Sequence, residues 1–383
     1  MNPDAAMYRA PLLWANVLMF VLTLACAVIV VPWYGFAYGY SGAAWIWFAV
    51  LLYANGLAIT GGYHRLWSHR TYDAHWSLRL VYLILGAMAL QNSVLVWASG
   101  HRNHHQNVDD NERDPYSAGR GLWFSHIGWM LRRYPSGETD FSNVRDLQRD
   151  PLVAFQHRYY YPLAIGLNVL VPLGLGWLHG DLWGVFLLAG VLRLVVSHHF
   201  TFLINSVAHA FGRQPYSDEH SARDNGWIAF LTYGEGYHNF HHQFAHDYRN
   251  GVRWWHWDPS KWIICSLSWV GVTKRLRRTP AVAIQRARLA MQFRRVEARL
   301  ERHRPSLPHV DLERLRATVS REYDQFVATV AAWSGLTDAW YTKTRERIVQ
   351  RWEKARFRKD TRALLFELRR QHRRLELLDA QLA

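Results

Sequence analysis

Cysteine is scarce in this chain, and the scarcity limits the metal chemistry that the sequence can support. Only Cys26 and Cys265 occur among 383 residues, and no CxxC pair is present. A disulfide framework or a thiolate metal site needs more cysteines than this. Any metal bound here must therefore use nitrogen and oxygen ligands.

Net charge is nearly absent from the first 273 residues. Residues 1–273 contain 18 Lys and Arg against 17 Asp and Glu, whereas residues 274–383 contain 27 against 13. The composition therefore changes near residue 274, and we expect a domain boundary there.

The neutral part holds four long apolar runs, and half of all residues are hydrophobic, with 20 Trp. A helix needs about 20 apolar residues to cross a bilayer, and aromatic residues gather where it leaves the membrane. The sequence predicts an all-α membrane domain over 1–273. We place its spans at 11–33, 43–63, 162–178 and 183–205.

A fifth segment, 80–98, is apolar but contains Gln91, Asn92 and Ser93. These polar residues favour an interfacial or re-entrant segment over a span. The first apolar run is too long for a signal-peptide core, so we expect no cleavable signal. Arg193 lies inside the fourth run, where a charge marks a functional site or a side chain that snorkels to the interface.

The basic residues are distributed unevenly about the spans. The connectors 34–42 and 179–182 contain no Lys or Arg, whereas the segments after His64 and after Asn205 are rich in them. By the positive-inside rule we expect both termini and every histidine cluster in the cytoplasm, with a bacterial inner membrane as the location.

The part from 274 to 383 is expected to be a basic, cytosolic extension of amphipathic helices. An apolar stripe recurs at steps of three and four residues. The stripe consists of Leu312, Leu315, Val319, Tyr323, Phe326, Val330 and Trp333. Pro305 and Pro308 are expected to separate it from an earlier helix, and Ser334-Gly335 from a later one. This extension would bind anionic lipid or an acidic electron carrier, or serve no dedicated partner; we expect no nucleic acid as a partner.

Histidine is the residue type that the chain has in excess. The stretch SGHRNHHQN (99–107) and the stretch GYHNFHHQF (236–244) share an HxxHH pattern. Offsets of three and four keep three side chains on one helix face, so each triplet can offer three nitrogens to a common point. The triplets are His101, His104 and His105, and His238, His241 and His242.

Two further pairs extend this set. HRLWSH contains His64 and His69 at an offset of five, about 140° apart on an α-helix, so we expect them to serve different ions or to lie where the helix leaves the membrane. NSVAH contains Asn205 and His209 at an offset of four, on one face. Nine imidazoles exceed the needs of one tetrahedral zinc site and fit two ions. Asp109, Asp110, Asp114 and Glu235 lie near these boxes and are candidates to orient the ligands, or to act as ordinary caps and ion pairs.

The boxes HRLWSH, HRNHH and HNFHH resemble those of the membrane-bound fatty acyl desaturases of the delta-9 acyl-CoA type. The similarity continues through RGLWFSHIGWML, FQHRYYYPL, NSVAHAFG and GEGYHNFHHQFAHDYR, over about residues 45–275. It implies a four-span helical bundle with a cytosolic cap that holds a dimetal site and a bent acyl tunnel.

The resemblance also implies a ligand set. The implied ligands are His64, His69, His101, His104, His105, His209, His238, His241 and His242, with Asn205 acting through water. The metals would be two iron ions, which zinc can replace in purified protein, and dioxygen would be the co-substrate. Gln91, Trp97, Thr201 and Phe202 would line the tunnel.

One stretch departs from the family pattern. Where the family has WARDHR, this chain reads WASGHR, with Ser99 and Gly100 in place of residues that contact the CoA head group. The acyl carrier is therefore left open between CoA, an acyl carrier protein and a lipid. Arg120, Arg132 and Arg133 are candidates for binding its head group, or belong to the cytoplasmic excess of positive charge.

The haem-carrier signature His-Pro-Gly-Gly is absent from the sequence, so a separate ferredoxin, flavoprotein or cytochrome is expected to supply electrons. Two other functions remain open at this point. A hydroxylase could use the same histidine scaffold, and a membrane receptor or scaffold could hold a structural zinc, although the latter needs only three or four ligands.

Overall fold

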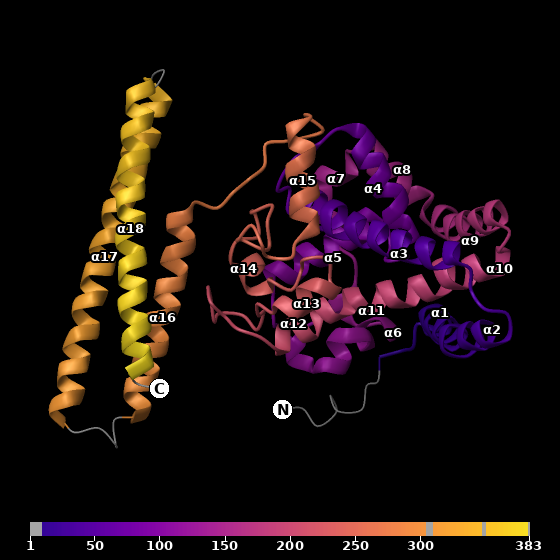
Figure 1. Ribbon diagram of the computed structural model, residues 1–383, viewed down its shortest axis with the longest axis horizontal. Helices are drawn as coiled ribbons and strands as arrows, with labels where there is room; N and C mark the ends of the chain where they lie inside the picture. Colours follow the sequence, from indigo (N-terminus) through magenta and orange to yellow (C-terminus); the bar gives the residue numbers. More distant parts are fainter. Residues whose placement is uncertain (1–9, 304–308, 347–349, 382–383) are drawn as a thin grey trace. The chain divides into compact units, whose positions relative to one another are not determined.

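The computed structural model describes residues 10–303, 309–346 and 350–381, and this part of the chain is almost entirely helical (Figure 1). The predicted all-α fold is confirmed. Its described strands are β1 (Asp73–Ala74) and β2 (Thr273–Lys274), which pair antiparallel. The chain divides into two compact units. The first comprises Met1–Arg213 and His220–Arg278, and the second comprises Gln214–Glu219 and Thr279–Ala383.

Within the described residues, four helices are long and apolar enough to cross a membrane, as predicted. They are Trp14–Ala37, Gly42–Ser68, Tyr160–His179 and Leu182–Ala210. The first consists of α1 (Trp14–Ala25), η2 (Cys26–Val30) and α2 (Val31–Ala37), and the second of α3 (Gly42–Leu57) and η3 (Ala58–Ser68). The third is α9 (Tyr160–His179). The fourth consists of α10 (Leu182–Val185), η8 (Phe186–Leu192), α11 (Arg193–Asn205) and α12 (Val207–Ala210). The second and fourth continue past their predicted ends at 63 and 205 because their polar ends are buried in the first unit.

The two connectors that lack Lys and Arg lie together at one end of the bundle. Ser41 caps α3, and its hydroxyl donates a hydrogen bond of 2.5 Å to Asp181. Asp181 in turn accepts from the amide of Gly184 at 2.9 Å and caps α10. Each side chain therefore accepts from an amide that the start of a helix leaves unpaired. The Ser41–Asp181 hydrogen bond also joins the connector between the first two spans to the connector between the last two.

The apolar segment 80–98 is divided between two helices. It contains the end of α4 (Trp76–Met88) and the start of α5 (Val94–Gln106), and Ser93 caps α5. Leu90, between them, has a φ of 52°. At about 1.5 Å per residue α4 reaches roughly 20 Å, which is too short to span a bilayer. The segment is therefore not among the four spans, as the sequence indicated.

Arg193 does not snorkel. Its side chain is fully buried, and its guanidinium donates to the carbonyl oxygens of Ala189 and Met88, each at 2.9 Å, and to Oδ1 of Asn168 at 2.7 Å. Met88 is the last residue of α4, so its carbonyl has no partner within that helix. Arg193 therefore joins α4, α9 and the fourth span, which is a structural role.

The remaining helices of the first unit form the cap. Two of them, α5 and α14, carry the histidine triplets (Figure 1). The others are η4 (Ala118–Arg120), η5 (Phe124–Gly128), α6 (Trp129–Leu131), η6 (Pro135–Gly137), η7 (Phe141–Val144), α7 (Arg145–Gln148), α8 (Pro151–Arg158), α13 (Gly226–Leu231) and α15 (Pro259–Trp269), and α14 spans His238–Gln243.

The second unit consists of three helices around an apolar core. They are α16 (Ala281–His303), α17 (His309–Glu346) and α18 (Arg351–Gln381). Of the predicted stripe, Val319 and Phe326 are buried, and Leu315, Val330 and Trp333 pack against the same core. Tyr323 lies at the edge of the stripe, 46% exposed, with its ring 5.4 Å from that of the buried Phe293. Pro305, Pro308 and the side chain of Leu312 lie outside the described residues.

The predicted break at Ser334-Gly335 was wrong, because α17 continues through both residues. A glycine inside a helix costs about 1 kcal/mol relative to alanine. The packing of α17 on its neighbours through Val330 and Trp333 offsets such a cost.

Candidate metal centre

The pair His64 and His69 is brought together by a π-helical turn. The helix η3 is a π-helix, and the amide of His69 donates to the carbonyl oxygen of His64 at 3.0 Å. A π-turn closes at an offset of five residues, so these side chains lie nearly one above the other. Their ring centroids are 4.8 Å apart. The sequence offered two alternatives for this pair, and the one that gave them different ions assumed the α-helical pitch. The structure instead places both residues in one group.

Nine histidines converge in two groups. Within each group one ligand atom per residue lies within 4.8 Å of all the others. The first group is His64, His69, His101, His105 and His241; the second is His104, His209, His238 and His242. Each sequence triplet is therefore divided between the groups, which corrects the expectation of one common point per triplet. The reason is that α5 and α14 face each other, so each helix contributes to both groups.

The convergent atoms are the Nε2 nitrogens. In the first group His64 and His105 each approach His241 at 3.0 Å, and His69 approaches His101 at 2.8 Å. In the second group the corresponding contacts are 3.3 Å between His104 and His242, and 3.1 Å from His238 to His209 and to His242.

The proton on His104 is fixed by a buried carboxylate. Nδ1 of His104 lies 2.9 Å from both oxygens of Asp114, a residue with no exposed surface. An ionised carboxylate only accepts, so Nδ1 carries the hydrogen and Nε2 has a bare lone pair. The amides of Asp109 and Tyr116 also donate to Asp114, at 3.1 Å each, and hold it in place.

His64 is oriented in the same way by Glu235. Nδ1 of His64 lies 3.1 Å from Oε2 of Glu235, which is only 2% exposed. Burial raises the pKa of Glu235, but His64 and the Arg65 guanidinium outweigh this and lower it to about 2. Arg65, itself buried, also pairs with Asp258 at 2.9 Å. The charged carboxylate is therefore compensated on the side away from the histidines.

A third relay supports His209. Nδ1 of His209 lies 2.7 Å from the hydroxyl of Ser221, and this hydroxyl donates to Asp109. The hydroxyl must therefore accept from Nδ1, which again leaves the lone pair on Nε2. Asp110, by contrast, accepts from the amides of Glu112 and Arg113 and caps a turn. Of the four acidic candidates, Asp110 alone acts as an ordinary cap.

Six histidines of the two groups that lie outside the spans are held neutral. Burial, followed by the neighbouring imidazoles, lowers the pKa of six residues well below the ordinary value. They are His69, His101, His105, His238, His241 and His242. A neutral imidazole is the form that binds a metal.

This donor set fits metal ions. Three relays, two of them through the buried carboxylates of Asp114 and Glu235, direct the Nε2 lone pairs of three histidines toward other Nε2 atoms. These histidines are His64, His104 and His209. Facing lone pairs repel unless a cation lies between them. The imidazole-rich shells, with no thiolate, suit divalent iron or zinc, and the two groups provide for two ions. Asn205 is the last residue of α11, four residues before His209, and its contribution through water stays a prediction.

Comparison with known proteins identifies the family. The profile described as "Fatty acid desaturase" matches residues 42–264. The chain belongs to the fatty acid desaturase family. It is 40% identical over 290 residues to "Acyl-CoA desaturase 1" of Saccharomyces cerevisiae, covering 74% of this chain and 55% of that one.

Two further relatives show the same similarity. The "Probable acyl-CoA desaturase" of Schizosaccharomyces pombe is 44% identical over 62% of this chain and 50% of its own. The "Stearoyl-CoA desaturase 5" of Bos taurus is 37% identical over 73% of this chain and 84% of its own. The chain thus spans about half the length of the two yeast desaturases and most of the bovine one.

One of the predicted tunnel residues, Trp97, contacts a histidine of the first group. Trp97 stacks on His101, with ring centroids 4.8 Å apart and 27° between the planes. Gln91 donates to the hydroxyl of Thr201 at 2.9 Å and so joins the start of α5 to α11. The Gln91–Thr201 hydrogen bond joins segments that are 110 residues apart. The role of these residues in substrate binding stays a prediction.

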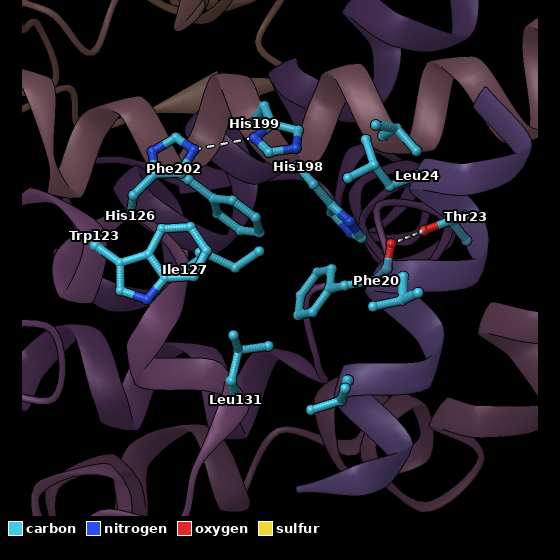
Figure 2. A pocket seen from close by; sticks show the side chains of 13 residues that line it. Phe20, Thr23, Leu24, Trp123, His126, Ile127, Leu131, His198, His199 and Phe202 are labelled. Carbon is cyan, nitrogen blue, oxygen red and sulfur yellow. Dashed lines mark hydrogen bonds between the residues drawn. The ribbon is translucent and has the colours of Figure 1, made fainter. Parts of the chain in front are cut away.

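Phe202 lies elsewhere. It borders an apolar cavity of about 240 Å³ between α1, α11 and the segment that contains η5 (Figure 2). His126 and His199 meet at its wall through a hydrogen bond of 3.0 Å. Neither is a member of a metal group. The role of Phe202 in the acyl tunnel stays a prediction.

The three head-group arginines are differently engaged. The Arg120 guanidinium lies over Phe124, 3.6 Å from its ring centroid, and also faces Tyr134. Arg132 donates to the carbonyl of Ala10 at 2.7 Å and thereby holds the segment before α1. Arg133 is exposed. Arg132 therefore has a structural partner already, whereas Arg133 is accessible to a ligand.

Sequence reasoning missed several residues of the site. Ser221 and Tyr116 contact histidines, Arg65 contacts the carboxylate of Glu235, and Asp258 pairs with Arg65. Nδ1 of His101, for example, lies 3.2 Å from the hydroxyl of Tyr116. Arg65 could have been found from its position beside His64. Ser221 and Asp258 have no sequence signal, because only the fold brings them to the site.

Proposed function

We propose that this protein is a dioxygen-dependent di-iron desaturase that introduces a cis double bond into a saturated fatty acyl chain. The delta-9 position follows from the resemblance of its histidine boxes. The observation that carries the proposal is the pair of histidine groups whose Nε2 atoms converge at 2.8 to 3.3 Å with carboxylates behind them.

The ions would be held by the nine histidines, with Asn205 reaching one of them through water. Two bound irons would supply a reduced centre at which dioxygen removes hydrogens from an unactivated methylene pair. Asp114, Glu235 and the Ser221–Asp109 relay hold the Nδ1 proton on three of the nine histidines and leave their Nε2 free for a metal; these are His104, His64 and His209. Zinc can occupy the same nitrogens but has no redox chemistry, so it would leave the protein inactive.

The acyl chain is the substrate, and it offers no polar handle near its middle. Shape must therefore position it. Trp97, stacked on His101, and the Gln91–Thr201 hydrogen bond would fix where the chain bends. Phe202 lines the cavity between α1 and α11 and would contact the acyl chain there.

The acyl carrier is proposed to be CoA, in keeping with the names of the relatives, rather than an acyl carrier protein or a lipid. The family's Arg-Asp pair is replaced, and Ser99 is buried and donates to the carbonyl of Asp140 at 2.7 Å. The exposed Arg133 is then the best available contact for a phosphate of the head group. Arg120 contributes from a position over its two aromatic rings.

A separate electron donor is required by the stoichiometry. Reduction of dioxygen to water takes more electrons than are released when two hydrogens are removed to form one carbon–carbon double bond. A ferredoxin, flavoprotein or cytochrome supplies the remaining electrons. We further propose that the metal groups and both termini lie in the cytoplasm, because the Ser41–Asp181 end of the bundle lacks Lys and Arg. The location in a bacterial inner membrane stays a prediction.

The test is expression of the full chain in a host that lacks its own desaturase, followed by lipid profiling. A new cis-monounsaturated acyl chain with the double bond at one position is expected. Hydroxylated chains instead would favour a hydroxylase on the same scaffold. Unchanged lipids, together with a single zinc per purified chain, would favour a structural metal site and contradict the proposal.

A further inference from the structure

The outer face of α18 carries a line of large apolar and basic side chains. Steps of three, four and seven residues stay on one face of an α-helix. The residues of this face, which we name the α18 stripe, are Trp352, Lys359, Phe366, Arg370, Arg373 and Leu377.

The opposite face of α18 is already used. Leu368 and Leu375 are fully buried in the core of the second unit, together with Leu289 and Phe293. The α18 stripe therefore points away from the bundle. All its members are exposed among the residues that the structure describes.

The exposure of the apolar members is large. Trp352 is 62%, Phe366 61% and Leu377 69% exposed. A single exposed apolar residue needs no explanation, but three on one line of one helix indicate a surface that contacts something. They extend over 25 residues, or roughly 38 Å of helix.

The basic members are available for an anionic partner. Lys359 and Arg373 have no carboxylate within ion-pair distance in the described part of the chain, whereas Arg370 pairs with Glu367 at 3.2 Å. Residues 274–383 as a whole carry 27 basic against 13 acidic residues. The helix α18 itself carries ten Lys and Arg against five Asp and Glu, so the helix that bears the stripe is net positive.

We propose that the α18 stripe binds the surface of an anionic phospholipid bilayer. Trp352, Phe366 and Leu377 enter the boundary between head groups and acyl chains, and Lys359 and Arg373 lie against the phosphates. Apolar anchors alternating with Lys and Arg are typical of helices that lie in this boundary. A long, narrow line of apolar anchors matches a flat bilayer surface. A protein interface would instead use a compact apolar patch with a polar rim.

The chain itself favours this contact. The four spans of the first unit keep the second unit near a membrane, so binding by α18 is intramolecular and takes place at a high effective concentration. This inference does not depend on the chemistry at the histidines, and the two can fail separately.

The test uses the full chain in nanodiscs with a spin label on the α18 stripe. Cys26 and Cys265 are replaced by Ser, and Ala363→Cys, in line with the stripe, carries the label. Ala298→Cys on α16, also exposed, is the matched control. Discs of phosphatidylcholine alone are compared with discs that also contain phosphatidylglycerol, and collision rates with oxygen and with a water-soluble nickel chelate report depth.

With phosphatidylglycerol we expect the label at Ala363→Cys to collide more with oxygen and less with the nickel chelate, and the label at Ala298→Cys to be unchanged. Higher salt should weaken the difference. The substitutions Lys359→Gln and Arg373→Gln together should abolish it. Arg286→Gln and Arg302→Gln, which remove the same charge from exposed positions on α16, should leave it intact.

Three outcomes would overturn the proposal. The label at Ala363→Cys could report water in both kinds of disc. It could respond only when two chains share a disc, which would make the α18 stripe a contact between copies. It could respond to an acidic electron-carrier protein added to phosphatidylcholine discs but not to anionic lipid, which would make it a docking site for protein.

Discussion

The amide nitrogen of His69 lies 3.0 Å from the carbonyl oxygen of His64, the hydrogen bond of a π-helical turn. This turn lets two histidines at an offset of five join the same group, with their rings 4.8 Å apart. It occurs where the second span leaves the apolar region and enters the cap. The irregular pitch therefore has a structural consequence: it places two histidines at the end of an apolar helix in one candidate metal group.

The carboxylate behind His104 should control metal affinity. In Asp114→Asn one carboxylate oxygen becomes an amide nitrogen, which cannot accept a hydrogen bond. In the parent chain both oxygens accept from donors, namely Nδ1 of His104 and the amides of Asp109 and Tyr116. We expect metal affinity to fall by about 10- to 100-fold, as for other groups that orient a ligand. Metal content after competition with a chelator measures this. Asp110→Asn, at a turn cap that does not contact histidine, is the control, and an equal loss in both variants would argue against the relay.

The buried ion-pair cluster around Arg65 should be important for stability. Arg65→Met would leave the buried Glu235 and Asp258 without their cation. Removing one partner of a buried pair costs about 3 to 5 kcal/mol, whereas an exposed pair contributes about 1 kcal/mol or less. Thermal unfolding in detergent should therefore show a large loss for Arg65→Met. Arg70→Met, whose side chain is 64% exposed and 3.8 Å from Asp146, should differ little from the parent chain.

Trp97 and Thr201 should separate metal support from substrate positioning. Thr201→Val removes the acceptor for Gln91 but touches no histidine, so we expect altered chain-length preference or double-bond position with unchanged metal content. Trp97→Ala also removes the ring stacked on His101 and should lower metal content as well. Lipid profiles and metal analysis of the same preparations compare the two. Normal metal content in Trp97→Ala would mean that the stacking does not orient His101.

The departure WASGHR can be tested at each of its two positions. A Cβ added at Gly100 meets nothing within 4 Å, so Gly100→Asp should fold normally. Ser99 is buried and hydrogen-bonded to the carbonyl of Asp140, so Ser99→Arg should lower the melting temperature. Thermal unfolding of the two single variants checks this expectation. A stable Ser99→Arg variant would mean that the helix can move to admit the family's residue.

The sequence predicts those features that depend on composition and short-range spacing. Four apolar runs of sufficient length led to four spans, and the nine histidines were identified one by one. The division of each triplet between two groups was not predictable, because it depends on α5 and α14 facing each other. Neither was the π-turn at His64, since periodicity analysis assumes one pitch.

Contacts between distant segments were also beyond sequence reasoning. Ser221 reaches His209, and Asp258 reaches Arg65 across 193 residues, with no local pattern that marks either one. The continuation of α17 through Gly335 was missed for a different reason. A propensity cost of about 1 kcal/mol is smaller than the gain from burying the apolar face, and only the structure reveals that gain.

The most direct test of the central claim is metal content and product formation in protein from its native host, with one histidine removed from each group. The di-iron assignment predicts two irons in the parent chain, one for each histidine group. It also predicts that His104→Ala and His241→Ala insert normally but contain less iron and form no double bond. Full activity in either variant, or a single zinc with no iron in the parent chain, would contradict it.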